Sequence, residues 1–396
     1  MYYNRMKSVD KLKTNGLIYK CELQKVHCLS EELRLGLAAI YQDNMQVLCI
    51  KRERGVALNT GKILFLNKNE VKKIISPAEA LKLTEVALQE YARGSTINPI
   101  KLSMSIHPYH DGHINSMPSY MQLGDIAGVK IVSVYNNNPQ KYGLPTTLGT
   151  IILYDSETGL PVCIMDGTQI TDLRTGAVSG INAKYFARKD SNSLAVVGAG
   201  MQGYTSMQMT LSTLSGIQDV IVCDLDESRC KRFIKLASEE FPKHRFSMCS
   251  DHRQALMQTD VVIYATSAPR PLLNNVDVIK PGSTVICVCE LLTRRAVSLF
   301  DMWYVDFAEC ALDRYNDGGR HSAKMYGDTW EDLTEELITG EIGKVTVGEV
   351  PGRKNDQQRI LASAVGMSVE DVIIAKEVYD TAVSEKIGKI LDFQCL

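Results

Sequence analysis

A glycine-rich turn, Gly198-Ala-Gly200-Met-Gln-Gly203, follows directly on the apolar run Leu194–Val197. In such a turn the first glycine permits a tight bend, the second lets the backbone approach a pyrophosphate, and the third lets the next helix pack closely on the strand. The helix expected over Tyr204–Leu214 would offer unpaired N–H groups and a positive dipole end to the phosphates. An ordinary strand-to-helix turn is the alternative, but the apolar strand before the glycines and the helix after them favour dinucleotide binding.

An acidic residue ends the next expected strand, where a ribose would lie. Asp224 directly follows Val220–Cys223. A carboxylate at this place accepts hydrogen bonds from ribose hydroxyls and repels a 2′-phosphate, which favours NAD over NADP. Arg229 is close in sequence and leaves NADP open as the less favoured cofactor.

Apolar runs and helical segments alternate from residue 191 onward. Short runs rich in Val and Ile, bounded by turns, are typical of strands that are buried on both faces of a parallel sheet. Six such strands are enough for a doubly wound Rossmann-type domain, which makes the fold class α/β. The expected strands are Leu194–Val197, Val220–Cys223, Phe246–Cys249, Val261–Ala265, Thr284–Val288 and Trp303–Val305.

The chain on either side of this alternation has a different pattern. Ser76-Pro-Ala-Glu79 predicts a helix start, with Ser as the N-cap and Glu at the third position. The tail Ser368–Leu391 is amphipathic and predicts one helix. Further strands and one helix are expected at Ile100–Ile106, Ile126–Tyr135, Thr150–Tyr154 and Thr171–Arg188.

Composition excludes several classes of protein. Lys and Arg number 44 against 46 Asp and Glu, so the basic excess of a dedicated nucleic-acid binder is absent. No apolar run approaches the length of a membrane span, and the first residues lack the apolar core of a signal peptide. The 11 Cys form no CxxC pair, which favours free thiols over a disulfide framework or zinc ribbon. A cytoplasmic protein without nucleic-acid or membrane partners is expected.

Several short motifs occur in one order over roughly residues 62–392, and together they are far more specific than the glycine turn. In these motifs the sequence resembles the ornithine cyclodeaminase/mu-crystallin family. They are Asn115-Ser-Met-Pro118, Gly128-Val-Lys130-Ile-Val, Gly143-Leu-Pro-Thr146, Asp166-Gly-Thr, Leu173-Arg-Thr-Gly-Ala177, Ala183-Lys-Tyr-Phe-Ala-Arg188, Gly198-Ala-Gly-Met-Gln202 and Pro351-Gly-Arg353.

The resemblance implies a split architecture and a homodimer. Residues 61–180 and 345–396 would form an α+β substrate-binding and dimerisation domain, and residues 181–344 the Rossmann domain inserted in it. Residues 1–60 fall outside the match, as an N-terminal extension of unknown role.

The resemblance also implies chemistry at the Cα–N bond of a small amino or imino acid, with hydride transfer to or from nicotinamide. Lys101, Lys130 and Arg174 match the family's carboxylate clamp, and Arg suits a carboxylate because its fork binds both oxygens. Any one of these cations could instead be an ordinary solvated surface charge. Lys130, however, stands in an otherwise apolar strand, where a lysine tends to be paired or functional. It could also donate a proton. Asn115 and Met117 would contact substrate.

Cofactor contacts are expected at Gly198, Gly200, Met201, Gln202, Gly203, Asp224, Thr146, Thr175, Thr266, Ser267 and Val288.

Two departures from the family pattern bear on the reaction. Related enzymes usually have an Asp after the strand that corresponds to Thr284–Val288, and this Asp transfers protons. This chain has Glu290 there, which could transfer protons in the same way or be a surface carboxylate. Asn115 replaces an acidic residue expected in ornithine cyclodeaminases, and a neutral amide cannot pair with a distal ammonium. Both favour net oxidoreduction, by an amino-acid dehydrogenase or ketimine reductase.

Two other functions stay open at this stage. One is the redox-neutral lyase reaction of ornithine cyclodeaminase, and the other is a mu-crystallin-like binding protein without turnover. His107, His110 and His113 could bind zinc, but Asp111-Gly112 predicts a hairpin turn there, so exposed turn residues are favoured and no metal site is predicted.

Overall fold

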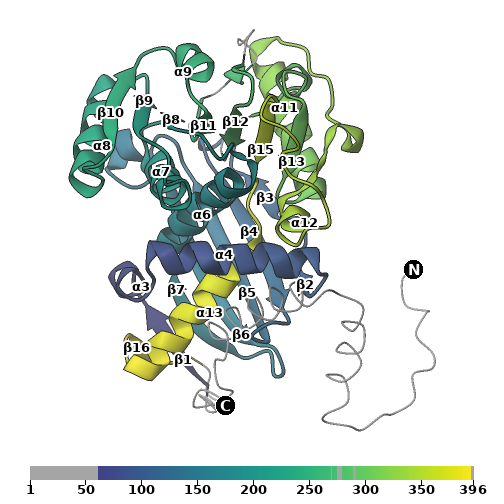
Figure 1. Ribbon diagram of the computed structural model, residues 1–396. Coiled ribbons are helices and arrows are strands. Elements are labelled where there is room, and N and C mark those ends of the chain that lie inside the picture. Colours follow the sequence, from purple (N-terminus) through teal and green to yellow (C-terminus); the bar gives the residue numbers. More distant parts are fainter. Residues whose placement is uncertain (1–60, 269, 274–278, 289–290, 394–396) are drawn as a thin grey trace, which may run out of the picture. The chain divides into compact units, whose positions relative to one another are not determined.

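The computed structural model describes residues 61–268, 270–273, 279–288 and 291–393, and these form two eight-stranded sheets (Figure 1). The predicted extension 1–60 and the candidate Glu290 lie outside the described residues. None of the described helices combines the length and the apolar character that crossing a bilayer requires.

The first sheet is mixed and carries the substrate half of the motifs. Its strands are ordered β16-β1-β7-β6-β5-β4-β2, with β3 paired to β4, and only β1 and β7 run parallel. The predicted hairpin around Asp111-Gly112 is confirmed as the β3–β4 connection. The strands are β1 Lys62–Leu66, β2 Thr96–Ile97, β3 Leu102–Ser105, β4 His113–Met121, β5 Ile126–Val134, β6 Thr147–Asp155, β7 Pro161–Asp166 and β16 Lys389–Asp392.

Helices α3 (Lys68–Ile74), α4 (Pro77–Ala92) and α13 (Ser368–Glu385) accompany this sheet, and α13 packs on β4, β5, β6 and α4 (Figure 1). Short α5 (Asn138–Tyr142) joins β5 to β6. The capping box predicted at Ser76 and Glu79 starts α4 as expected.

The predicted tail helix Ser368–Leu391 is too long. It ends at Glu385, where Lys386 adopts a left-handed φ of 57°. Gly388, with φ of 96°, turns the chain so that β16 pairs antiparallel with β1. All four residues of β16 are exposed, so Ile390 and Leu391 do not extend the buried stripe of the helix.

The second sheet is wholly parallel, as expected for a Rossmann-type domain, and its order is β10-β9-β8-β11-β12-β15-β13-β14. The α/β fold class is thereby confirmed. The strands are β8 Ser193–Val197, β9 Asp219–Cys223, β10 Arg245–Cys249, β11 Val261–Tyr264, β12 Thr284–Cys287, β13 Met302–Val305, β14 Gly340–Glu341 and β15 Ile360–Ser363. The helices that go with it are α7 Met201–Thr213, α8 Glu227–Glu240, α9 His252–Gln258, α10 Arg294–Val297, α11 Ala308–Tyr326 and α12 Ile342–Thr346.

Two strands of this sheet, the two-residue β14 and β15, were not predicted. Ile360–Ser363 (β15) lies between β12 and β13, although it comes from the 345–396 segment expected in the substrate half. A fully buried four-residue run has no period of its own, so nothing distinguished it from the surrounding loop. The domain boundaries themselves stay predictions.

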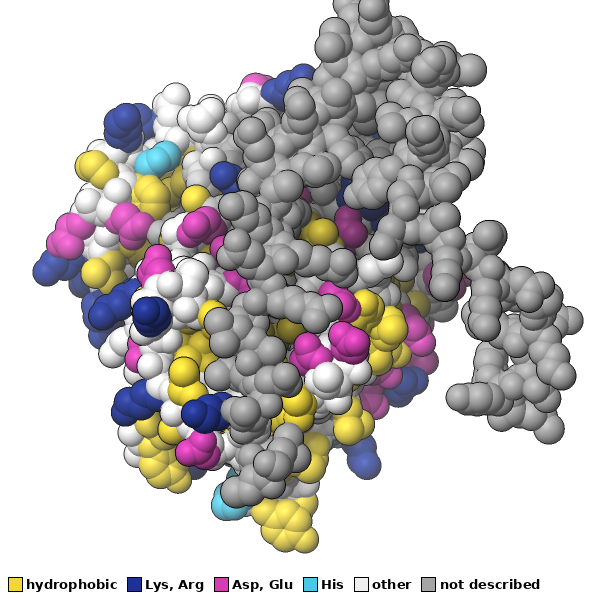
Figure 2. Space-filling model, turned by 90° about the horizontal axis from the view of Figure 1, so that it is seen from below, with side chains coloured by type: hydrophobic (Ala, Val, Ile, Leu, Met, Phe, Trp, Pro, Cys, Tyr) yellow, Lys and Arg dark blue, Asp and Glu magenta, His cyan; other side chains and the backbone are white. Residues whose placement is uncertain are grey.

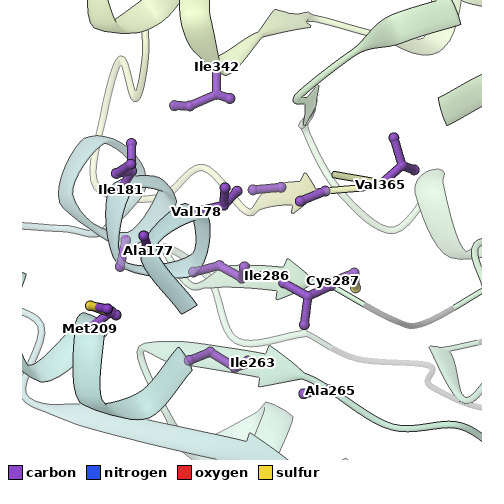
Figure 3. Packing of buried hydrophobic residues seen from close by; sticks show 14 of the residues in the cluster. Ala177, Val178, Ile181, Met209, Ile263, Ala265, Ile286, Cys287, Ile342 and Val365 are labelled. Atoms are coloured by element: carbon purple, nitrogen blue, oxygen red, sulfur yellow. The ribbon is translucent and has the colours of Figure 1, made fainter. Parts of the chain in front are cut away.

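Helix α6 (Thr168–Phe186) links the two sheets and packs tightly on α7. Any Cβ on Gly176 or Gly180 would overlap the α7 backbone at Thr205 or Met209, so these glycines set the close approach. Figure 3 shows Ala177, Val178 and Ile181 of α6 packing toward Ile286 of β12 and Met209 of α7. This packing brings the N-terminal half of α6 beside the glycine turn that opens α7.

Candidate active site

The glycine turn stands at the carboxyl end of β8. Gly198 has φ of 109°, and a Cβ there would overlap the carbonyl of Ala265, while a Cβ on Gly203 would overlap the carbonyl of Gly198. Around Gly200, the residue before α7, a Cβ would meet open space instead. Two glycines therefore close the turn, and the third leaves room for a ligand at the N-terminus of a 13-residue helix.

Asp224 lies directly beside this turn. Its Oδ2 accepts from the backbone N–H of Ala199 at 2.8 Å and its Oδ1 from that of Asp226 at 2.9 Å. The carboxylate is half-buried and keeps free lone pairs on both oxygens. The residues present fit a dinucleotide, with Asp224 placed for ribose hydroxyls and the α7 N-terminus for phosphates.

We expect Asp224→Ser to shift the cofactor preference toward NADPH. Serine keeps an acceptor near Ala199 but removes the charge that repels a 2′-phosphate, so the ratio of the NADPH and NADH dissociation constants should fall at least about tenfold. Titration by cofactor fluorescence measures both constants, with Glu227→Gln on exposed helix α8 as the control. An unchanged ratio would mean that Asp224 does not face the ribose.

A second link ties α6 to the turn. Gln202 donates from Nε2 to Asp172 Oδ1 at 2.8 Å, and burial raises the pKa of Asp172 to about 6. Thr175, buried one residue after Arg174, lies on the same helix beside α7. Met201 is exposed at the start of α7.

All but one of the remaining candidate cofactor residues follow strands whose carboxyl ends meet at one sheet edge, and the exception is Thr146. Thr266 and Ser267 follow β11, Val288 follows β12 and donates its N–H to Tyr264, and Thr146 precedes β6 in the other sheet. Because parallel neighbours end together, Val197, Tyr264 and Cys287 stand side by side in register. This edge is where doubly wound sheets bind their ligands.

Lys130 is fully buried on β5, opposite Met117 of β4. Its Nζ forms an ion pair with Asp371 Oδ2 of α13 at 2.5 Å. Burial and the nearby Arg174 guanidinium lower the pKa of Lys130 to about 8, against the opposite effect of Asp371. An ammonium in this state can exchange its proton near neutral pH.

Arg174 comes from α6 and meets the same carboxylate. Its Nε donates to Asp371 Oδ1 at 3.1 Å and its Nη1 to Glu370 Oε2 at 3.4 Å. Burial raises the pKa of Glu370 to about 8, so this group is largely protonated at pH 7. Gly366, with φ of 80°, lies so close that a Cβ would overlap the guanidinium.

Lys101, just before β3, is the third predicted cation. Its Nζ donates to the carbonyl of Val365 at 2.7 Å, and burial followed by the charge of Arg314 lowers its pKa to about 8. On the other side of the same peptide, Asp306 accepts from the N–H groups of Val365 and Gly366 at 3.0 and 2.6 Å. The loop after β15 is therefore held between the two halves of the site.

The other sequence candidates lie on the same face of the first sheet. Asn115 and Met117 are both buried, and alternation along β4 places their side chains on the side of Lys130. His107 and His110 are exposed near the hairpin turn, whereas His113 begins β4 and is half-buried. Within the described ranges, no three His, Cys, Asp or Glu side chains come together as a metal ion would require.

Comparison with known proteins identifies the family of this chain. The model of the ornithine cyclodeaminase/mu-crystallin family matches residues 62–386. The chain belongs to this family. It is 28% identical to Δ1-pyrroline-2-carboxylate reductase of Bacillus cereus over 344 residues, which cover 84% of this chain and 100% of the relative.

Two solved structures of the family are similar over most of the chain. The structure of Thermococcus litoralis Δ1-pyrroline-2-carboxylate reductase with NADH and L-proline has a TM-score of 0.74 and 30% identity, covering 83% of this chain and 99% of the other. An archaeal alanine dehydrogenase dimer with bound NAD has a TM-score of 0.73 and 28% identity, covering 84% and 100%.

In this member of the ornithine cyclodeaminase/mu-crystallin family, the structure brings Lys130 and Arg174 to one carboxylate and places Lys101 at the adjoining loop. The sequence did not predict the acidic partners Asp306, Glu370 and Asp371. Adjacent Glu370 and Asp371 in the first turn of the amphipathic tail helix were the available signal, and both are wholly buried there.

Proposed function

We propose that this protein transfers hydride between NAD(H) and the α-carbon of a small amino or imino acid, with Lys130 moving the proton and Lys101 and Arg174 holding the carboxylate. It is an enzyme of the NAD-dependent amino- and imino-acid oxidoreductase class to which its family relatives belong. The observation that supports the assigned roles is the buried Lys130–Asp371–Arg174 group, in which two cations share one carboxylate.

The relatives support this reaction class. Both the Bacillus cereus relative and the Thermococcus litoralis structure are Δ1-pyrroline-2-carboxylate reductases, and the latter holds NADH and L-proline. The archaeal alanine dehydrogenase holds NAD. These reactions change the same bond, the one between the α-carbon and its nitrogen, because each interconverts an amine and an imine at the carbon that bears the carboxylate.

The chain's own residues divide the work as follows. When bound, the nicotinamide supplies or accepts the hydride. Lys130 delivers a proton to the reacting nitrogen during reduction and takes it back during oxidation, which its lowered pKa of about 8 allows near neutrality. Arg174 is oriented by Asp371 and Glu370, and Lys101 by Val365, so both cations are held before substrate arrives. Burial keeps water away from this proton.

Cyclodeamination is the alternative reaction, and neutral Asn115 argues against ornithine as its substrate. The two reactions differ in their redox balance, because cyclodeamination regenerates its NAD while net oxidoreduction does not. We expect steady NADH consumption with a 2-oxo acid plus amine or with a cyclic imine, followed at the NADH absorbance band. Proline formation from ornithine without net NADH change would support the lyase reaction instead.

A ligand-binding protein without turnover is the second alternative. It would keep NADH affinity and show no product by mass spectrometry with any amino or imino acid offered. The buried cation group argues against it, because a protein that only binds a dinucleotide has no use for a carboxylate clamp.

We propose NAD as the cofactor, with NADP less favoured, a homodimer, and a cytoplasmic location. Figure 2 shows the molecule from below, where hydrophobic and charged side chains are mixed. Exposed apolar side chains share the outer face of the first sheet. They are Phe65, Leu102, Met104, Ile131 and Leu148. A sedimentation experiment on the purified protein should give twice the mass of one chain.

The cytoplasmic location rests on the cysteines. Cys163, Cys223, Cys230, Cys249 and Cys310 are free thiols, as in a reducing compartment.

A further inference from the structure

Helix α11 carries an arginine, Arg314, that faces the substrate half of the site and takes no part in the clamp described above. The helix starts directly after Asp306 and Phe307. Cys310 in its first turn is buried against the backbone and charge of Lys101. Near its far end, the His321 ring lies 6.4 Å from the ring of His107. The helix therefore approaches the hairpin at two points, the residue before β3 and the loop between β3 and β4.

Arg314 lies between these two points of contact. It is four residues after Cys310, so both side chains lie on one face of the helix. Its charge acts on groups of the opposite half, since it is the second cause, after burial, that lowers the pKa of both Lys101 and His113. Arg314 is half-buried.

The order of residues along β4 indicates in which direction the side chain of a bound substrate would extend. Met117 pairs with Lys130 across β4 and β5, and Asn115 and His113 follow on the same side of β4. Two residues along a strand span about 6.6 Å, so His113 lies roughly 13 Å from Met117. A substrate whose α-carbon is next to Lys130 would extend its side chain past Asn115 toward His113 and Arg314.

Within the part of the chain that the structure describes, the positive charge of Arg314, at the His113 end of the site, has no carboxylate as a partner. Among the described residues Arg314 has neither a hydrogen bond nor an ion pair, whereas every buried carboxylate of the site is engaged. Asp371 meets Lys130 and Arg174, Glu370 meets Arg174, and Asp306 accepts from backbone N–H groups. A guanidinium fork in this position fits an incoming carboxylate, and the neutral amide of Asn115 does not repel one.

We propose that Arg314 binds a second carboxylate on the substrate's side chain, so that the preferred substrate is an amino or imino acid with an acidic side chain. This assignment rests on the proposed function, because it takes the Lys130 end of the site as the place of the α-carboxylate. His113, whose pKa is lowered by burial and by the charges of Arg314 and Lys101, would lie beside this carboxylate as a hydrogen-bonding group.

Binding of a matched pair of 2-oxo acids tests the assignment without any turnover. 2-Oxoglutarate and 2-oxopentanoate have the same carbon chain and differ only in the distal carboxylate. We expect the protein–NADH complex to bind 2-oxoglutarate at least about tenfold more tightly, as measured by calorimetry. Arg314→Met should weaken 2-oxoglutarate about 10- to 100-fold and change 2-oxopentanoate less than about threefold. Arg314→Lys should keep part of the preference.

The control is Arg320→Met, an exposed arginine of the same helix that pairs with Asp332, and it should change neither affinity. Equal affinity of the wild-type complex for both acids, or equal weakening of both by Arg314→Met, would overturn the assignment. If the 2-oxoglutarate preference is lost in Arg314→Met but no amine with either acid consumes NADH, the proposed function fails and the Arg314 contact stands.

Discussion

Replacing Lys130 with methionine is expected to lower kcat in the reducing direction about a thousandfold, because a positioned proton donor contributes about 10²–10⁴ to such a step. Methionine has nearly the length of lysine and fills the same buried space on β5 without a proton to give. Stopped assays of NADH consumption measure the loss. NADH affinity should stay within about threefold of wild type, since the glycine turn and Asp224 are untouched.

Lys184→Met is the matched control. Lys184 is an exposed lysine that pairs with Glu85 at 2.8 Å, on the helix that also carries Arg174. Its loss should leave kcat nearly unchanged, as surface ion pairs contribute little. A Lys130→Met enzyme with near-normal turnover would show that the proton comes from elsewhere, with Glu290 the first residue to test.

The pH profile separates a chemical role of Lys130 from a structural one. With a pKa of about 8, the ammonium is present below pH 8 and lost above it. Reduction needs the protonated form, so its kcat/KM should fall as pH rises through about 8, while oxidation needs the neutral amine and should rise through the same range. Glu370 titrates nearby, so Glu370→Gln must retain the inflection if Lys130 is its source.

The sequence predicted the cofactor half of this site well, because its determinants are local. The glycine turn needs only an apolar strand before it and a helix after it, and Asp224 needs only to end the next strand. Both properties can be recognised within thirty residues of sequence, and the structure has the turn at the start of α7 and Asp224 directly after β9. The contacts with the cofactor stay predictions. Lys130 also stood out locally, since an apolar strand does not keep a lysine in its interior without a partner.

The substrate half was predicted less completely, because its contacts join distant segments. Arg174 and Asp371 meet across 197 positions of the chain, and Lys101 and Val365 across 264. No pattern within one segment shows which carboxylate will face which cation. For the same reason β15 and the end of α13 escaped prediction, since each is decided by a strand neighbour far away in sequence.

Removing the carboxylate of Asp371 is expected to cost more stability than any other single change in the site. Asp371 is wholly buried and is the partner of both Lys130 and Arg174. Leaving a buried charge without its counter-ion costs about 3–5 kcal/mol, so Asp371→Ala should lower the free energy of unfolding by this amount in denaturant titrations. Asp380→Ala removes a carboxylate that is paired with Lys376 near the surface of the same helix, and should cost less than about 1 kcal/mol.

A double variant tells stability and chemistry apart in this pair. Lys130→Met with Asp371→Leu replaces both buried charges by apolar side chains of similar size, and such replacements are often neutral or stabilising. Asp371→Ala leaves two buried cations without this carboxylate, whereas the double variant leaves only Arg174, which still donates to the Glu370 carboxyl. The double variant should therefore regain at least about 2 kcal/mol relative to Asp371→Ala. Turnover should nevertheless remain about a thousandfold low, because the proton donor is still missing. If turnover returned together with stability, Lys130 and Asp371 would be a structural pair and the proton would have to come from another group.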